Sequence, residues 1–524
     1  MLRVKETSLD WALKHALNLG DTDVFPIPFE YRALESDWSA IKKYLRDVDV
    51  LQWQVRPLRT LLAPKGKFGF RIITQLDPLD FLLYAAAIRE IGSDLEKRRV
   101  PISDHVVFSY RFKPSTDGHL FDSTVGYGGF QERTRFILRD SKACAFVAVT
   151  DIADFYLRIY HHRLKGALEA ATPHSSHVGA IMSLLSGWNA TESYGIPVGN
   201  APSRLLAEIT ISDVDEALLG SNIKFVRYND DYRIFASTYS EAYRYLAFLA
   251  DFLYRNHGLT LQPQKTVVLS ANDFKERFLP SSPEDRELAA LEEKFDELIT
   301  KLNLEDRYTP IDYDDLDEEE KELIDSLNLV ELFQEHVSED NDIDVPLVRF
   351  ILRRLTQLGD GAILDDLLNN LDVLHPLFPE IIAYVRADKN LSNKDRAKIG
   401  KRILDLAERS IVSELDYHRM WALYLFAEST EWNNADRFPS LLAAARDQLS
   451  RRKLILAMGR ARQRYWFQGQ WRKLFEEAPW PRRAMLAGFS CLSPDPRKHQ
   501  FKAIESRLDP LEKAVMRWAK KQPF

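Results

Sequence analysis

Hydrophobic and polar positions change their spacing along the chain, and these changes divide it into regions. Up to about residue 140, helical periodicity mixes with turns and is clearest at 79–92, LDFLLYAAAIREIG. Across about 141–280, short apolar runs alternate with helical patterns, which predicts strands and helices in one domain. From residue 346 the strand pattern disappears and amphipathic segments follow one another, which predicts an all-α domain over 346–524.

Local patterns place several elements in the first two regions. The apolar run 145–150, AFVAVT, predicts a buried strand, and a helix is expected over 155–168. Residues 224–236, KFVRYNDDYRIFA, predict two short strands around a polar turn. The basic, glycine-containing stretch PKGKFGFRIITQ within 56–75 predicts a hairpin or loop over a charged ligand.

An acidic run at 312–320 marks a change of composition, and we expect a solvated helical linker over 281–345. The segments beyond it have the length and spacing of stacked helical hairpins, without a strict sequence repeat. They lie at 347–358, 363–373, 393–409, 414–427, 438–449 and 451–465. Spacing alone therefore favours a HEAT-like helical array.

Composition is that of a large globular protein. The 524 residues, 45% hydrophobic and 28% charged, predict two or three domains with a large core. A net charge of -7 argues weakly against a protein that coats nucleic acid, but it leaves room for a local basic channel. Cys144 and Cys491 are too far apart in sequence to indicate a disulfide framework or a zinc site. No signal peptide or transmembrane stretch is evident, so we expect a cytoplasmic protein with no membrane partner.

Three carboxylates are the candidate chemistry. Asp151 directly follows the 145–150 strand, and Asp230 and Asp231 occupy the turn of the predicted hairpin. Each position is also common for purely local reasons, because aspartate favours turns and helix caps. Two adjacent carboxylates near a third repel one another, however, and hard oxygen ligands suit Mg²⁺. Two such ions would suit in-line nucleotidyl transfer.

Four segments then match one family in order and spacing. The sequence resembles reverse transcriptases across about 50–275. The matching segments are DIADFY at 151–156, GIPVGNAPS at 195–203, YNDD at 228–231 and GLTLQPQKT at 258–266.

Three further segments narrow the resemblance. PKGKFGFRIITQLDPLDFLLY, VFSYRF at 107–112 and IYHHRL at 159–164 resemble the bacterial abortive-infection (Abi) and "unknown group" reverse transcriptases. The resemblance implies an α+β fold: right-hand fingers within 1–140 and palm within 141–280, followed by an all-α HEAT-like repeat domain.

The resemblance also implies roles for single residues. Asp151 and Asp230 would be the principal ligands of Mg²⁺, or of Mn²⁺ in its place, with Asp231 beside them. The carbonyl of Ile152 would add a ligand. Tyr156 occupies the place of the family's steric gate, where an aromatic ring disfavours a ribose 2′-hydroxyl.

Other residues would bind the nucleotide. Lys65 and Arg71 match the fingers and would contact the triphosphate, with Lys67 as a nearby competitor. Gly199 would let the backbone approach the nucleotide, and Ser203 belongs to the same segment. Lys265 is a candidate proton donor to the leaving pyrophosphate.

Two places depart from the family pattern. Asn229 fills the variable position of Y-x-D-D, where Ala, Val or Met is more usual, and Asn200 and Ala201 follow Gly199 in place of Ser and Pro. Both changes could alter nucleotide preference or the seating of a template. His161 and His162 are adjacent on a predicted helix and cannot easily face one ion, so we expect a structural or surface role.

The leading interpretation is an anti-phage DNA polymerase that uses dNTPs without a template. In Abi-type relatives a protein hydroxyl starts the chain, so a tyrosine here, Tyr31 or Tyr44, would become covalently attached to single-stranded DNA. Relatives form homo-oligomers, which implies the same for this chain.

Two alternatives stay open. One is templated copying of RNA with a partner RNA, which would need a basic duplex-binding surface. The other is an inactive polymerase-like scaffold that acts as a phage-sensing or binding module, against which the intact carboxylate set argues.

Overall fold

The computed structural model divides the chain into two compact units. It describes residues 1–66, 68–140, 143–189, 191–279, 329–337, 343, 345–359, 361–388 and 390–521. The first unit comprises Met1–Thr60 and Ile73–Ser282, and the second comprises Leu61–Ile72 and Pro283–Phe524. The acidic run at 312–320 and Lys67 lie outside the described residues. The predicted four-part division of the chain stays a prediction.

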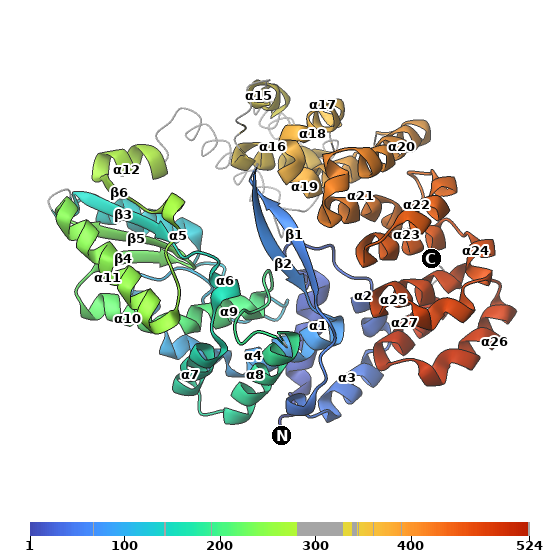
Figure 1. Ribbon diagram of the computed structural model, residues 1–524, viewed down its shortest axis with the longest axis horizontal. Coiled ribbons are helices and arrows are strands. Elements are labelled where there is room, and N and C mark those ends of the chain that lie inside the picture. Colours follow the sequence, from blue (N-terminus) through green and yellow to red (C-terminus); the bar gives the residue numbers. More distant parts are fainter. Residues whose placement is uncertain are drawn as a thin grey trace. The chain divides into compact units, whose positions relative to one another are not determined.

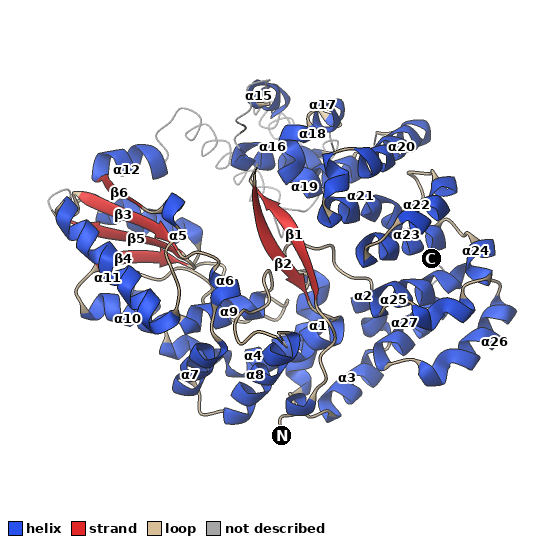
Figure 2. Cartoon of the chain, in the orientation of Figure 1, coloured by secondary structure: helices blue, strands red, loops and turns tan. Residues whose placement is uncertain are grey.

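The first unit contains a four-stranded antiparallel sheet (Figures 1 and 2). Its strand order is β4-β5-β3-β6. The strands are β3 (Phe146–Asp151), β4 (Lys224–Tyr228), β5 (Asp231–Ala236) and β6 (Val267–Ser270). The predicted strand at 145–150 and the predicted hairpin at 224–236 are therefore confirmed.

Helices make up the rest of the first unit. They are α1 (Glu6–Asn18), α2 (Glu30–Ser36), α3 (Trp38–Asp47), α4 (Pro78–Arg98), α5 (Tyr127–Ile137), α6 (Phe155–Arg158), α7 (His161–Ala171), α8 (Ser175–Trp188), α9 (Ala201–Thr210), α10 (Ser212–Gly220), α11 (Tyr239–His257) and α12 (Ala271–Phe278). The predicted helix at 79–92 lies within α4, which is capped by the Asp77 side chain and packs against α1, α8 and α9.

Alternation along the strands gives the sheet a buried face. Val147 and Val149 of β3 share that face with residues of the neighbouring strands, because side chains two apart point the same way. Phe130 of α5 and Phe274 of α12 pack against them in the same apolar cluster. This packing holds β3, and with it Asp151, in a fixed register.

The helix predicted over 155–168 is wrong in one respect, because it is broken into α6 and α7. Ile159 and Tyr160 are extended between the two helices. The cause is distant in sequence: Tyr160 forms a β-bridge with Tyr194, and the amide of Gly195 donates to the carbonyl of Ile159 at 2.8 Å. Helical periodicity could not reveal this pairing.

The basic stretch near residue 65 forms a hairpin, as predicted, from β1 (Arg59–Lys65) and β2 (Gly69–Gln75). Where β2 returns to the first unit, Thr74 pairs with Val198. The Thr74 amide donates to the Val198 carbonyl at 3.3 Å, and the Val198 amide donates to the Thr74 hydroxyl at 2.7 Å. The base of the hairpin is thereby tied to the 195–203 segment.

The second unit is mostly helical (Figure 2). Its helices are α15 (Leu329–His336), α16 (Val345–Leu358), α17 (Leu364–Asn369), α18 (Leu371–Leu374), α19 (Phe378–Ala387), α20 (Asn393–Arg409), α21 (Asp416–Glu428), α22 (Phe438–Ala444), α23 (Gln448–Arg460), α24 (Arg464–Gln468), α25 (Pro479–Gly488), α26 (Pro494–Ile504) and α27 (Pro510–Lys521). Helix α23 packs against α21, α22 and α25. The described residues from 345 to 521 include no strand, which confirms a helical C-terminal region. A HEAT-like repeat stays a prediction.

Among the described helices, none combines the length and the apolar character needed to cross a lipid bilayer.

Candidate active site

The end of β3 meets the turn between β4 and β5. Asp151 is the last residue of β3 and lies opposite Asp231 in the antiparallel register. Asp231 begins β5, so only Asn229 and Asp230 form the turn, a correction to the prediction that both aspartates lie in it. The amide of Ile152 donates to the carbonyl of Asp230 at 3.1 Å, which fastens the turn to the strand end.

Asn229 suits the turn for a local reason. Its φ of 56° lies in the left-handed region, which asparagine tolerates better than most residues. The β-branched valine that occupies this place in many relatives would be strained at that φ. The departure from the family pattern thus matches the backbone that this chain adopts.

The carboxyls of Asp151 and Asp230 lie close enough to affect each other's ionisation. Burial, followed by the charge of Asp151, raises the pKa of Asp230 to about 7. The pKa of Asp231 rises to about 6, first because of burial and also because of Asp151, against the opposing charges of Arg233 and Lys265. The cause is the same in both cases: negative charge is concentrated where water is scarce, so a nearby cation would be stabilised.

Lys265 supplies one such cation. It ends the 3₁₀ turn Pro263–Lys265, and its ammonium forms an ion pair with Asp151. The amide of Gln262 donates to the Asp151 carbonyl at 2.7 Å and so brings this turn to β3. Partial burial lowers the pKa of Lys265, but its three neighbouring aspartates outweigh that effect and raise it overall.

Tyr156 and Asp230 are linked through one side chain. The Tyr156 hydroxyl donates to Oδ1 of Asn229 at 3.1 Å, and Nδ2 of Asn229 donates to Oδ1 of Asp230 at 2.7 Å. Asn229 therefore fixes the ring of Tyr156 and the carboxylate of Asp230 at the same time.

A buried ionic network supports the turn from behind. Arg227 donates two hydrogen bonds to Asp215, at 2.8 and 2.6 Å, and contacts Glu208 at 3.0 Å. Its third nitrogen donates to the carbonyl of Asn229 at 2.8 Å, while the Asn229 amide donates to the hydroxyl of Ser109 at 2.8 Å. Both backbone groups of Asn229 are thus fixed by side chains that are themselves buried.

Sequence reasoning missed this network. Arg227 stands among apolar strand residues in KFVRY, and a charge in such a run is a signal of a buried partner. Arg99 also contacts Glu208, at 2.6 Å, so Glu208 has two cationic partners. The pKa of Glu208 is lowered because Arg227 and Arg99 outweigh the effect of its burial. Asp215 has Arg227 as its main partner, and burial raises its pKa.

Residues 95–291 match the family model described as "Reverse transcriptase (RNA-dependent DNA polymerase)". This chain contains a reverse transcriptase domain. The domain is that of an RNA-directed DNA polymerase-like nucleotidyltransferase, and the carboxylates described above lie within it.

Solved structures similar to the chain include telomerases of two Candida species. An apo telomerase from Candida tropicalis, truncated from its C-terminal domain, shares 16% identity over 48% of this chain and 55% of its own, with a TM-score of 0.31. The apo telomerase from Candida tropicalis shares 12% identity over 75% of this chain and 73% of its own chain, with a TM-score of 0.35. The Candida albicans telomerase in complex with a TWJ fragment of telomeric RNA shares 14% identity over 77% of this chain and 72% of its own chain, with a TM-score of 0.32.

The chain thus spans about half the length of the truncated telomerase. None of the curated proteins matches it.

Three other predicted residues lie within the reverse transcriptase domain. Ile152 is buried beside Asp230. Gly199 has a φ of 101°, which only glycine adopts freely, and its carbonyl accepts from the Asp23 amide at 3.1 Å. Ser203 is buried, and its hydroxyl pairs with the hydroxyl of Tyr84 at 3.0 Å. The nucleotide-binding roles of these residues stay predictions.

Lys65 and Arg71 are exposed on the β1–β2 hairpin, in the segment Leu61–Ile72 that groups with the second unit, whereas the carboxylates belong to the first. Their contact with a triphosphate stays a prediction. His161 is buried and its Nε2 lies 2.8 Å from the carbonyl of Gly195, the structural role that the sequence indicated.

The two priming candidates differ in accessibility. Tyr31 is fully buried, and burial raises the pKa of its hydroxyl well above the usual value. Tyr44 is 36% exposed and packs edge-on against Trp53. A nucleophile must reach its substrate, so the structure favours Tyr44 over Tyr31.

Among the described residues, no three His, Cys, Asp or Glu side chains converge so as to hold a metal ion. The donor chemistry at the end of β3 still fits Mg²⁺, because Asp151 and Asp230 offer hard carboxylate oxygens from neighbouring positions. Lys265 contributes positive charge at the same place. The three-aspartate ligand set stays a prediction.

Proposed function

We propose that this protein polymerises dNTPs into DNA by two-metal nucleotidyl transfer at Asp151, Asp230 and Asp231. The observation that carries the proposal is the hydrogen bond from the Ile152 amide, directly after Asp151, to the carbonyl of Asp230 at 3.1 Å. It joins the end of β3 to the YNDD turn within a reverse transcriptase domain. Lys265 offsets only part of the negative charge of the three partly buried aspartates, so the site would also attract a metal cation.

The three aspartates, with the carbonyl of Ile152, would hold Mg²⁺ or Mn²⁺. When bound, these ions activate the attacking 3′-hydroxyl and stabilise the leaving pyrophosphate. Lys265 keeps its proton at Nζ, since its neighbouring carboxylates raise its pKa, and would donate that proton to the pyrophosphate.

Nucleotide selection follows from the neighbouring residues. The ring of Tyr156, fixed by its bond to Asn229, would exclude a 2′-hydroxyl and favour deoxynucleotides. Lys65 and Arg71 would bind the triphosphate, and Gly199 would let the backbone approach the nucleotide.

The finer proposal follows the resemblance to the Abi group: an anti-phage enzyme that needs no template and starts DNA on a tyrosine. Exposure supports Tyr44 as that primer. The product would be single-stranded DNA attached to the protein, made in the cytoplasm by a homo-oligomer. The C-terminal helices, as a HEAT-like array, would enclose the product or build the oligomer interface.

The test is to incubate purified protein with Mg²⁺ and each dNTP in turn, without nucleic acid. We expect labelled DNA that migrates with the protein, that migrates faster after protease treatment because only a short peptide stays attached, and that nuclease degrades. Asp230→Ala should abolish it. Tyr44→Phe should abolish attachment, whereas Tyr254→Phe, a more exposed tyrosine at 68%, should not.

Two results would favour the alternatives. DNA that forms only when an RNA template and primer are added, and that is free of protein, would identify a templated enzyme with a partner RNA. Full biological activity in the Asp230→Ala variant would instead identify a sensing or binding scaffold.

A further inference from the structure

A second possible ligand site of the first unit lies along α5, outside the carboxylate cluster. A cavity of about 650 Å³ is bounded by α5 on one side and by residues of the 102–108 segment on the other. Arg133, Arg135, Phe136 and Arg139 line it from α5 and the residues just after it. A volume of this size is typical of small-ligand sites, which span roughly 300–1,000 Å³.

The cavity contains an exposed aromatic ring between two cations. Phe136 is 56% exposed, an unusual state for a phenylalanine, which is more often buried. The guanidinium carbons of Arg133 and Arg139 lie 5.1 and 5.7 Å from the centre of its ring. Such cation–π contacts hold both arginines at the ring and keep their remaining donors available.

The arginines of the cavity have no anionic partner among the described residues. In the part of the chain that the structure describes, no hydrogen bond or ion pair joins the side chain of Arg133, Arg135 or Arg139 to a carboxylate. Other arginines of the same unit, such as Arg99 and Arg227, are paired with buried carboxylates. In a chain of net charge -7, three arginines that line one cavity, two of them at the same ring, form a local positive site.

This combination suits a nucleotide of a single strand. Guanidinium groups bind phosphate through paired, charge-assisted hydrogen bonds. An exposed ring offers a stacking surface to a base, and only an unpaired base can use it fully. Glu132 also lines the cavity and would repel a phosphate, so the phosphate must lie on the side of the three arginines.

The same helix reaches the catalytic turn. Helix α5 packs against β4, and Tyr127 at its start stands edge-on to Tyr228 of the YNDD segment, with ring centres 5.4 Å apart. Helix α5 therefore has one face on the sheet beside the YNDD segment, and the cavity lies on its other face.

We propose that this cavity binds one nucleotide of single-stranded DNA, with the phosphate on Arg133, Arg135 and Arg139 and the base against Phe136. The choice of DNA rests on the proposed polymerase function. The binding chemistry itself rests only on the cavity.

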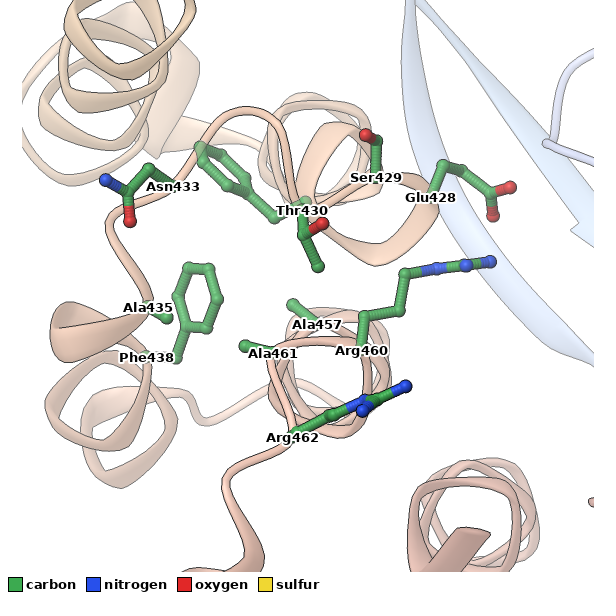
Figure 3. A pocket seen from close by; sticks show the side chains of 11 residues that line it. Glu428, Ser429, Thr430, Asn433, Ala435, Phe438, Ala457, Arg460, Ala461 and Arg462 are labelled. Atoms are coloured by element: carbon green, nitrogen blue, oxygen red, sulfur yellow. The ribbon is translucent and has the colours of Figure 1, made fainter. Parts of the chain in front are cut away.

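A cavity of similar size in the second unit, about 630 Å³, lacks these features (Figure 3). Its rings, Phe426 and Phe438, are each only 2% exposed and cannot stack on a base. Arg460, which Figure 3 shows beside Glu428, donates to the carbonyl of Ala427 at 2.6 Å. The α5 cavity is therefore the better candidate for nucleic acid.

The test measures binding without dNTPs or metal, by fluorescence anisotropy with labelled oligothymidylate and an oligouridylate of equal length. We expect the double variant Arg133→Gln/Arg139→Gln to bind DNA at least tenfold more weakly. The slope of log affinity against log salt concentration should decrease by the equivalent of about one to two phosphate contacts. Phe136→Leu should weaken binding by roughly tenfold to a hundredfold, since it loses stacking and keeps apolar volume. The matched control Arg3→Gln/Arg163→Gln removes the same charge from exposed sites and should change binding less than twofold.

Several results would overturn the proposal. Equal losses in the test and control doubles would mean that net charge alone attracts DNA. Unchanged DNA affinity with an altered oligomeric state would identify a protein interface, and tighter binding of oligouridylate would assign the cavity to RNA. Unfolding curves of all variants check the fold, and Arg135→Gln repeats the test if the double variant is unstable. Because Asp230→Ala should keep its DNA affinity, a failure of the polymerase proposal is distinguishable from a failure here.

Discussion

Replacing Arg227 with methionine would remove the cation that supports the catalytic turn from behind. Asp215, whose side chain is only 3% exposed, would lose both of its hydrogen bonds to Arg227. Glu208 would keep Arg99 and the hydroxyl of Ser109. The orphaned charge is therefore that of Asp215, and methionine fills much of the space of the arginine stem.

Breaking a buried ion pair by removing one partner costs about 3–5 kcal/mol. Total unfolding free energies are commonly only about 5–15 kcal/mol, so Arg227→Met should reduce stability by a large fraction. Adding Asp215→Asn removes the orphaned charge, and we expect the Arg227→Met/Asp215→Asn variant to regain about half of the loss or more. Exposed Arg163, replaced by methionine as a control, should change stability by less than about 0.5 kcal/mol.

The assay has two readouts. Urea unfolding at neutral pH gives the stability change, and nucleotide incorporation at a temperature where the variant stays folded gives the effect on the turn. Because Arg227 donates to the carbonyl of Asn229, we expect activity to fall at least tenfold. A stability loss below about 1 kcal/mol, or full activity in the folded variant, would refute the idea that this network holds the turn.

Three further predictions concern single sites. Burial raises the pKa of Asp21 to about 7. The free energy of unfolding should therefore fall as pH rises from about 4 through 7, by at most about 1.4 kcal/mol per pH unit. In Asp21→Asn, the free energy measured by urea unfolding should change less with pH over that range. Asn229→Gly keeps the positive φ but frees Tyr156, and discrimination between dNTPs and rNTPs, measured as a ratio of kcat/KM, should fall roughly fivefold or more. Gly199→Ala should lower Tm, because a φ of 101° costs an alanine about 1–2 kcal/mol; Gly166→Ala, with open space around it in α7, should raise Tm slightly.

Local patterns predicted those parts of the site that depend on neighbours in sequence. The alternation in KFVRYNDDYRIFA determines a hairpin, because both strands and their turn lie within one short segment. The position of Asp151 at a strand end follows from the apolar run before it. These predictions needed no knowledge of distant contacts.

The remaining features depend on contacts between distant segments. Arg227 gave a signal as a charge in an apolar run, but its partners Glu208 and Asp215 lie on two helices that no spacing rule connects to it. The break between α6 and α7 arises from the bridge of Tyr160 to Tyr194. The arginines beside Phe136 line a cavity together with residues of the 102–108 segment, and no spacing rule connects these two segments.

The hairpin segment Leu61–Ile72 belongs to the second unit although the chain on both sides of it belongs to the first. A fragment that ends at residue 282 would therefore carry this segment without the unit to which its contacts assign it. Separate expression of the two halves of the gene would leave the second unit without its hairpin segment, and a split version of the protein would need both fragments in the same cell to complete that unit.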